Sequence, residues 1–472
     1  MTISQNHRHL GGTLTFLCFT SLHLLQSQGI QPWKENPSYW SFRGEPVLLV
    51  GGSDDDNLFQ WPADQLIPQL DQLANAGGNV IRNTMSDRQD KGFEVYPFLR
   101  LADGRYDLNQ WNPVYWDRFE RMLRETAKRN IIVQIEIWDR FDYTDNRDRN
   151  HWQRHPYHPN NNINYTLKES GFAARYPDHP GANKQAFFYT SPKQRNNQVV
   201  LSYQEAFVDK LLGHSLNYEH VLYCIDNETK AEPAWGEYWA RRIKERARKE
   251  GKTIYVTEMW DAWDLTSAEH RQTFDRPELY DFVDVSQNNH NSGQKHWDNF
   301  LHVKNYLSSK PRPMNTTKTY GATGNKFGHT DQDAIERFWR HLIAGAASAR
   351  FHRPDSGIGL NPKAKACLSA VRLVERSLRF WDLKPVMNRI ETIQGSQAYL
   401  AESSEQALLC FLPLGTESIT INATGYEGSV TITWIRLEDG PIRMKMQVKA
   451  SKSLSFRVPH TANWLAIVRS EN

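Results

Sequence analysis

Eight short apolar runs alternate with amphipathic helical patterns along most of the chain. The runs cover residues 46–51, 79–83, 131–138, 221–227, 253–258, 282–287, 313–318 and 349–352. Such an alternation is typical of a parallel α/β fold, and eight strand–helix units predict a closed (β/α)₈ TIM barrel. An open, doubly wound sheet is the structural alternative, but no glycine-rich phosphate turn follows the first run.

Two of the intervening helices have clear start signals. Asn112-Pro113 places an N-cap directly before a proline in the first helical turn. Thr330 begins a second helix in the manner of a capping box. In both cases apolar residues at helical spacing follow, which predicts one buried face against the strands.

The segment of residues 139–195 interrupts the alternation after the third run. It is rich in His, Asn and Pro, and it carries several Trp and Tyr residues. Its aromatic content argues against disorder, and loops of this length are usually functional. Because it follows a barrel strand, we expect it to form a wall of a cleft at the C-terminal end of the barrel.

After residue 385 the pattern changes to short alternating runs separated by turn signals. These runs are residues 399–401, 408–412, 419–422, 430–437, 444–448, 454–458 and 464–468. They predict a small all-β sandwich over residues 386–472, following a barrel over residues 30–385. This domain either caps the barrel or binds carbohydrate.

Residues 1–29 are typical of a secretory signal peptide. His7-Arg8-His9 gives a weakly basic start, residues 14–25 are mostly apolar, and Ser27-Gln28-Gly29 is a small-x-small cleavage pattern. We therefore expect a secreted or periplasmic protein, although a disordered N-terminus is the simpler alternative. The apolar run is too short for an integral membrane segment, and none is expected elsewhere.

Charge and cysteine usage narrow the classes of partner. The net charge is +3 and there is no long basic run, which argues against nucleic acid. Cys18, Cys224, Cys367 and Cys410 have no metal-ligand spacing, so we expect neither a metal nor a cofactor. The chain has 16 Trp and 19 Tyr, and such rings stack on the apolar faces of sugars when they are not core residues.

Polar residues gather where the predicted strands end, which is where barrels of this kind place their active sites. The sharpest signal is Asn227-Glu228 at the end of the fourth strand. This pair, with Arg82 ending the second strand, resembles the pattern of the clan A glycoside hydrolases, a superfamily that includes many cellulases and mannanases. The resemblance covers residues 32–383, and the β-rich tail is similar to that of cellulase-like bacterial proteins.

The resemblance implies that Glu228 is the proton donor and then the base, and that Asn227 binds the hydroxyl next to the anomeric carbon. It also implies a nucleophilic glutamate at the end of strand 7, where this chain has Lys318. Lysine cannot be that carboxylate. Glu258, which ends the neighbouring fifth strand, is the leading candidate for the second carboxylate. The structural alternatives are a helix N-terminal carboxylate for Glu228 and an ion-paired acid for Glu258.

Further residues at the strand ends are candidates for binding the substrate. They are Arg82, Asn83, Trp138, Asn227, Trp260, Lys318, Tyr320, His352 and Arg353. Lys318, Arg82 and Arg353 together would form a basic patch, which suggests a uronic or sulfated sugar. The run Asp54-Asp55-Asp56 after the first strand is expected to be solvated, with cation binding as the alternative.

Three functions remain compatible with these residues. The first is a glycoside hydrolase that cleaves an oligo- or polysaccharide with two carboxylates, Glu228 acting as acid/base. The second is a non-catalytic glycan-binding barrel, which Lys318 in strand 7 suggests. The third is a polysaccharide lyase with Lys, Tyr or His as the base. Fold alone does not choose among them.

Overall fold

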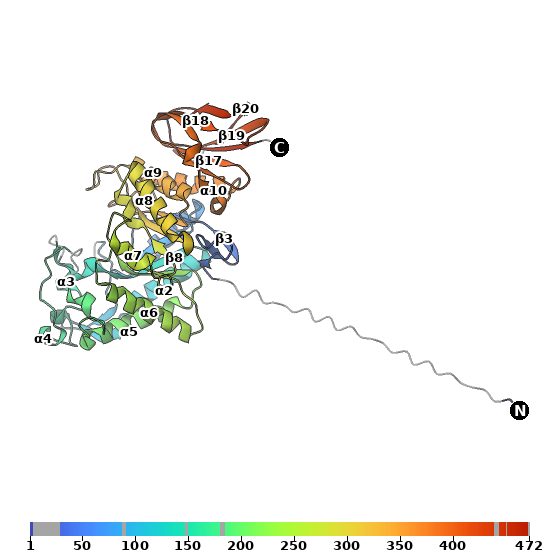
Figure 1. Cartoon of the computed structure of the whole chain (residues 1–472). Helices are drawn as coiled ribbons and strands as arrows, with labels where there is room; N and C mark the ends of the chain where they lie inside the picture. Colours follow the sequence, from blue (N-terminus) through green and yellow to red (C-terminus); the bar gives the residue numbers. More distant parts are fainter. Residues whose placement is uncertain are drawn as a thin grey trace.

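The computed structural model describes residues 1–2, 29–86, 91–146, 150–179, 185–438, 443–449 and 451–470. Most of the predicted signal peptide and Cys18 lie outside the described residues. Within them, no helix combines the length and the apolar character needed to cross a membrane. Figure 1 shows the two parts of the chain, with the C-terminal strands in red beyond α9 and α10.

The centre of the molecule is a parallel sheet of eight strands. These are β4 (Leu49–Gly52), β5 (Val80–Thr84), β8 (Ile132–Asp139), β9 (Val221–Asn227), β10 (Val256–Thr257), β11 (Val283–Asp284), β12 (Met314–Thr319) and β13 (Ser348–Phe351). The spatial order is β10-β9-β8-β5-β4-β13-β12-β11, so the last strand pairs with the first. That pairing confirms the predicted barrel and excludes an open doubly wound sheet.

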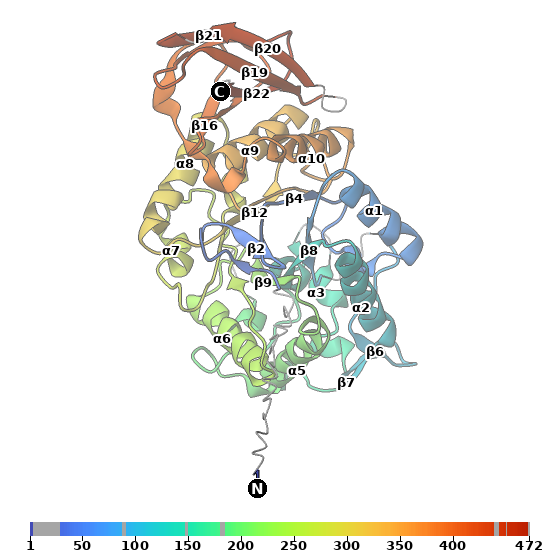
Figure 2. The same cartoon turned by 90° about the vertical axis from the view of Figure 1, so that its right-hand side faces the viewer.

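Each barrel strand is followed by a helix of the outer layer. The helices are α1 (Ala63–Asn75), α2 (Pro113–Lys128), α5 (Gln198–Ser215), α6 (Pro233–Lys249), α7 (Ala268–Phe274), α8 (Gly293–Tyr306), α9 (Asp331–Ala344) and α10 (Pro362–Glu375). Figure 2 shows them arranged around the strands. Both predicted helix starts are confirmed, since Asn112 accepts a hydrogen bond from the Val114 amide and Thr330 forms a capping box with Asp333.

A small sheet near the N-terminus covers the end of the barrel at which the strands begin. It consists of β1 (Gln31–Pro32), β2 (Trp40–Phe42) and β3 (Glu45–Val47), and Figure 2 shows it in blue. Trp40 is fully buried and donates a hydrogen bond from Nε1 to Asn315 Oδ1 at 2.9 Å. Asn315 in turn donates to Gln134. This closure leaves the opposite, C-terminal end of the barrel for the site.

Two excursions extend that C-terminal end. A hairpin of β6 (Phe98–Arg100) and β7 (Tyr106–Trp111) follows β5, and the long segment after β8 contains α3 (His151–Arg154) and α4 (Leu167–Ser170). The segment has an aromatic core of its own. Within it the Tyr143 and Phe187 rings stack with centroids 3.7 Å apart, and Trp152 is fully buried. Such packing holds together the described parts of a segment for which the sequence predicts no regular helix or strand.

The C-terminal part forms two antiparallel sheets. The larger contains β14 (Lys384–Pro385), β16 (Tyr399–Glu402), β17 (Leu408–Leu412), β22 (Trp464–Ser470), β19 (Ser429–Arg436) and β20 (Arg443–Lys449), and the smaller contains β15 (Ile390–Gly395), β18 (Thr416–Asn422) and β21 (Ser453–Arg457). A separate apolar core lies between them, which confirms the predicted all-β fold. The C-terminal part packs on the barrel through other side chains, such as Tyr399 of β16, whose ring lies 4.9 Å from that of Trp297 on α8.

Candidate active site

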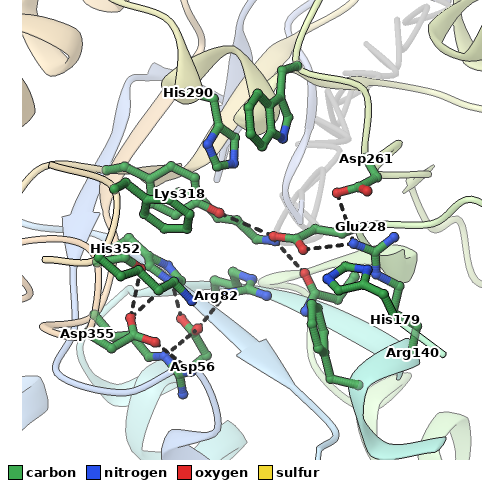
Figure 3. Close-up of a pocket in the computed structure, with 18 of the residues that line it drawn as sticks. Asp56, Arg82, Arg140, His179, Glu228, Asp261, His290, Lys318, His352 and Asp355 are labelled. Atoms are coloured by element: carbon green, nitrogen blue, oxygen red, sulfur yellow. Dashed lines mark hydrogen bonds and ion pairs between the residues drawn. The ribbon is translucent and has the colours of Figure 1, made fainter. Parts of the chain in front are cut away.

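A pocket opens at the C-terminal end of the barrel, and residues on or after all eight strands line it. These residues are Asp56 after β4, Arg82 on β5, Arg140 after β8, Glu228 after β9, Asp261 after β10, His290 after β11, Lys318 on β12 and His352 after β13. The cavity volume is about 370 Å³, within the usual range for small-molecule sites. Figure 3 shows these side chains converging.

Most of the predicted site residues line this pocket. They are Arg82, Asn227, Glu228, Lys318, Tyr320, His352 and Arg353. The long segment after β8 supplies a wall, as expected, through Phe141, Thr144, Asn146, His151 and His179. Within the described residues, no group of three or more His, Cys, Asp or Glu side chains is arranged to hold a metal ion.

Glu228 lies at the centre of the pocket, directly after β9. Its backbone adopts the left-handed conformation, with φ of 57°, which is uncommon for a residue with a side chain and is found often at functional sites. A hydrogen bond from the Thr229 amide to Met259 O, at 2.7 Å, holds the turn in place. The Glu228 side chain keeps 14% of its surface exposed, so a ligand in the pocket can reach it.

Both carboxylate oxygens of Glu228 contact cations. Lys318 Nζ lies 2.5 Å from Oε1, and Arg140 Nη2 lies 3.3 Å from Oε2. Lys318 Nζ also donates to Asn227 Oδ1, and the Tyr320 hydroxyl donates to Glu228 Oε1 at 3.2 Å. Burial alone would raise the pKa of Glu228, but the charges of Lys318 and Arg140 outweigh it and hold the pKa well below 4.5. Glu228 is therefore ionised at neutral pH.

Asp261 is a second carboxylate beside Glu228. Its Oδ1 lies 2.9 Å from Arg140 Nη2, the same nitrogen that contacts Glu228. Burial raises the pKa of Asp261 to about 6, a change that Arg140 opposes and the negative charge of Glu228 reinforces. The two carboxyl groups thus share one guanidinium nitrogen but differ in pKa, and a difference of this kind separates the acid from the base in glycosidases.

On another side of the pocket, Asp56 is the hub of an ion-pair network. Arg82 Nη1 lies 2.7 Å from Asp56 Oδ2, Arg350 Nη2 lies 3.1 Å from Oδ1, and Arg353 Nε lies 3.4 Å from Oδ2. Burial would raise the pKa of Asp56, but Arg82 and the other basic neighbours hold it well below 3.8. The acidic run after strand 1 is therefore not solvated as expected, because Asp55 and Asp56 are buried.

The predicted basic patch is neutralised by these carboxylates. Arg82 also pairs with Glu136 at 2.5 Å, Arg353 pairs with Asp355 at 2.9 Å, and Lys318 pairs with Glu228. His352 does not add a positive charge at neutral pH, because burial lowers its pKa to about 3. Because these cations are already paired with carboxylates, they give no reason to expect a uronic or sulfated sugar.

Aromatic rings form the side of the pocket next to Asp261. Trp263 stacks on His290 with centroids 4.1 Å apart and an interplanar angle of 16°. His290 also contacts Tyr320, at a centroid distance of 4.8 Å, and Phe327, at 5.3 Å. Trp263, His290, Tyr320 and Phe327 all line the cavity. Rings of this kind beside a pair of carboxylates can hold the apolar face of a sugar.

Solved structures similar to this chain are glycoside hydrolases. One described as a glycoside hydrolase has a TM-score of 0.62 at 12% identity, covering 94% of this chain and 97% of its own. A glycoside hydrolase family 5 structure from Bacteroides vulgatus has a TM-score of 0.62 at 13% identity, covering 94% and 93%. The chain has the fold of these glycoside hydrolases. No protein-family model matches it, and neither does any curated protein.

The glycoside hydrolase fold does not bring Glu258 into the pocket, which corrects its predicted role. Glu258 is 1% exposed, and its Oε2 lies only 2.5 Å from the position a Cβ would take on Gly236 of α6. Side chains alternate between the two faces of a strand, and Glu258 falls on the face that α6 covers. Burial and the nearby Asp226 raise its pKa well above 4.5, so it is a neutral acid between barrel and helix.

Three predicted binding residues are likewise turned away from the cavity. Trp138 is buried among rings of the helix layer, 5.3 Å from Trp239. Trp260 is buried and donates from Nε1 to Thr273 Oγ1 at 2.8 Å, and Asn83 accepts a hydrogen bond from the Phe59 amide at 3.1 Å. Each side chain fills the space between the sheet and its outer layer, so none of the three is available to a ligand.

Several side chains that line the pocket are not among the predicted site residues, and Arg140, Asp261, Trp263 and His290 are the ones that bear on its chemistry. Each lies one to several residues beyond a strand, in a loop whose path the hydrophobic pattern does not determine. The available signal was the concentration of Asp and Trp in residues 258–264, directly after the fifth apolar run.

Proposed function

We propose that the protein is a glycoside hydrolase in which Asp261 is the proton donor and Glu228 the ionised carboxylate. This proposal replaces the acid/base role that the sequence resemblance implies for Glu228, because Lys318 and Arg140 hold the pKa of Glu228 well below 4.5. One observation carries the proposal: both carboxyl groups contact Arg140 Nη2 inside the pocket, yet their surroundings shift the two pKa values in opposite directions. Between the two pKa values Asp261 is protonated and Glu228 is ionised. Glycoside hydrolysis needs one protonated and one ionised carboxyl group on either side of the scissile bond. The fold it shares with glycoside hydrolases supports the class of reaction, and the choice of Asp261 and Glu228 rests on the contacts and pKa shifts alone.

In the proposed reaction, Asp261 protonates the glycosidic oxygen while Glu228 acts on the anomeric carbon. The contacts of 2.9 and 3.3 Å to one nitrogen place the nearest carboxylate oxygens closer together than the roughly 6.5 Å at which inverting pairs begin. This spacing favours direct attack by Glu228, formation of a glycosyl-enzyme intermediate, and net retention. Asp261, deprotonated by the first step, then takes a proton from the water that releases the sugar.

Lys318 stands where the resemblance implies a nucleophile, but in the proposed reaction it positions and charges Glu228 instead. It holds the carboxylate of Glu228 and the amide of Asn227 in one position and keeps Glu228 ionised. Ion pairing also lowers the basicity and nucleophilicity of a carboxylate. This last effect favours the second candidate, a non-catalytic glycan-binding barrel, and an experiment has to separate the two.

A screen of neutral and acidic oligosaccharides tests the proposal. We expect new reducing ends from at least one substrate, and NMR of the first product should show the anomer of the substrate. Binding by calorimetry without any cleavage would support the glycan-binding candidate instead. An unsaturated product that absorbs in the near ultraviolet would indicate the lyase.

The pH dependence of kcat/KM should reveal the two carboxyl groups. Asp261 must be protonated, so activity should fall as the pH rises through about 6. Glu228 must be ionised, so the acidic limb should lie well below 4.5. We therefore expect maximal activity on the acidic side of pH 6, measured as initial rates from about pH 3 to about pH 8. A profile that stays flat through pH 6 would contradict Asp261 as the proton donor.

A further inference from the structure

Trp263 is exposed to an extent that packing does not explain. It has 55% of its surface accessible, more than any other large apolar residue of the described chain except the terminal Met1. It lies in the pocket lining. A single exposed apolar residue is normal on a protein surface, but a tryptophan that keeps its face open within a pocket of charged side chains suits a ligand with an apolar face.

The ring is held in place before any ligand arrives. One face stacks on His290 at 4.1 Å, and the Trp263 carbonyl accepts a hydrogen bond from Asn291 Nδ2 at 2.7 Å. Arg337, which is 1% exposed, then donates to Asn291 O at 2.8 Å and to Tyr320 O at 3.0 Å. One buried guanidinium thus ties the loops after β11 and β12 together. A fixed ring loses little entropy on binding a ligand.

The Trp263 ring lies on the same side of the pocket as the proposed proton donor. Trp263 follows Asp261 by two residues, and in Figure 3 Asp261 and His290 lie on one side of Glu228 while Asp56, His352 and Asp355 lie on the other. The ion-pair network of Asp56 supplies alternating donors and acceptors, which suit the hydroxyl groups of the sugar that Glu228 attacks. The aromatic side remains for the other half of the substrate.

We infer that Trp263, backed by His290, is the subsite for the sugar that leaves. The inference rests on the proposed function, because the group that departs is the one whose oxygen Asp261 protonates. The ligand class is a pyranose ring that lays an apolar C–H face on the indole. Burial lowers the pKa of His290 to about 4, so the stack is uncharged near neutral pH and has no preference for an anionic sugar.

Two substrates that share the attacked sugar but differ in the leaving group test the inference. An oligosaccharide loses a sugar, whereas the glycosyl fluoride loses only fluoride, which fills no subsite. We expect Trp263→Ala to lower kcat/KM for the oligosaccharide about tenfold, the value of one stacking contact of about 1.4 kcal/mol. The fluoride should be cleaved at the wild-type rate, and Trp263→Phe should recover part of the loss.

Tyr306→Ala provides the matched control. Tyr306 is also an exposed aromatic residue, at 39%, but it lies on α8 and does not line the pocket, so both substrates should be cleaved normally. Equal loss on the two substrates in Trp263→Ala would place the ring beside the attacked sugar and overturn the inference, as would no loss on either. If the wild-type protein cleaves neither substrate, the proposed function itself fails, a result distinct from cleavage that is indifferent to Trp263.

Discussion

Glu228→Gln should lower kcat/KM on the cleaved glycan by about 10⁴-fold. Gln preserves the shape of the side chain but cannot attack the anomeric carbon or accept a proton. It also leaves Lys318 and Arg140 without the charge they both contact. Initial rates with the best substrate of the screen give the loss, and calorimetric binding of the same glycan should show that the pocket of the variant still accepts it.

Glu258→Gln is the matched control, since the same replacement is made on a glutamate that ends the next strand. Glu258 is a buried neutral acid beside Gly236 and Tyr280, so a neutral amide should leave kcat/KM close to the wild-type value. The assignment would be wrong if Glu258→Gln abolished activity, or if Glu228→Gln retained it.

Asp261→Asn completes the set because it separates the two carboxyl groups by role. Fluoride needs no proton to leave, so a variant without the proton donor should still form the glycosyl-enzyme intermediate from the glycosyl fluoride, at a kcat/KM close to wild type, while it loses the oligosaccharide. The kcat for the fluoride should fall, because Asp261 is also the base that activates water in the second step. The alkaline limb near pH 6 should also disappear. Loss of both substrates would instead indicate that Asp261 acts on the anomeric carbon.

The sequence predicted the barrel because its strands are short apolar runs that coincide with the observed ones. It also predicted the side chains closest to the strand ends, such as Arg82, Glu228 and Lys318, because parallel strands bring their C-terminal ends together. The predictions that Glu258 and Trp138 lie in the pocket were wrong for one shared reason. The hydrophobic pattern does not show which face of a fully buried strand a side chain takes, since both faces are apolar.

Asp261 and Trp263 were not predicted as site residues for a different reason. They lie in the loop after β10, where the chain is placed by contacts such as Asn291 with Trp263 and Arg140 with Asp261 that join distant parts of the sequence. Lys318 shows the complementary case. The sequence predicted Lys318 at the end of strand 7, where the resemblance implies a nucleophilic glutamate, but only the ion pairs indicate that this charge keeps Glu228 ionised.

Lys318→Met should lower the free energy of unfolding by about 3 kcal/mol at neutral pH, because it removes one partner of a buried ion pair while Arg140 still contacts Glu228. The double variant Lys318→Met/Glu228→Gln should recover much of that loss, since no unpaired charge remains at the pair. Lys363→Met removes a surface ion pair with Asp331 of 2.8 Å and should change the unfolding free energy by less than about 1 kcal/mol.

The loss of unfolding free energy in Lys318→Met should depend on pH, and the pKa of Glu228 sets the direction of that dependence. Because its pKa in the folded wild type lies well below the ordinary 4.5, its ion pairs stabilise the protein fully above pH 4.5, and that contribution is lost as the pH falls toward the folded pKa. Lys318→Met removes much of this depression, so the difference between wild type and variant should shrink as the solution is acidified below about pH 4.5. Urea unfolding at a series of pH values measures it. A difference that stays constant into acid would show that Lys318 stabilises the barrel by packing and not by its charge.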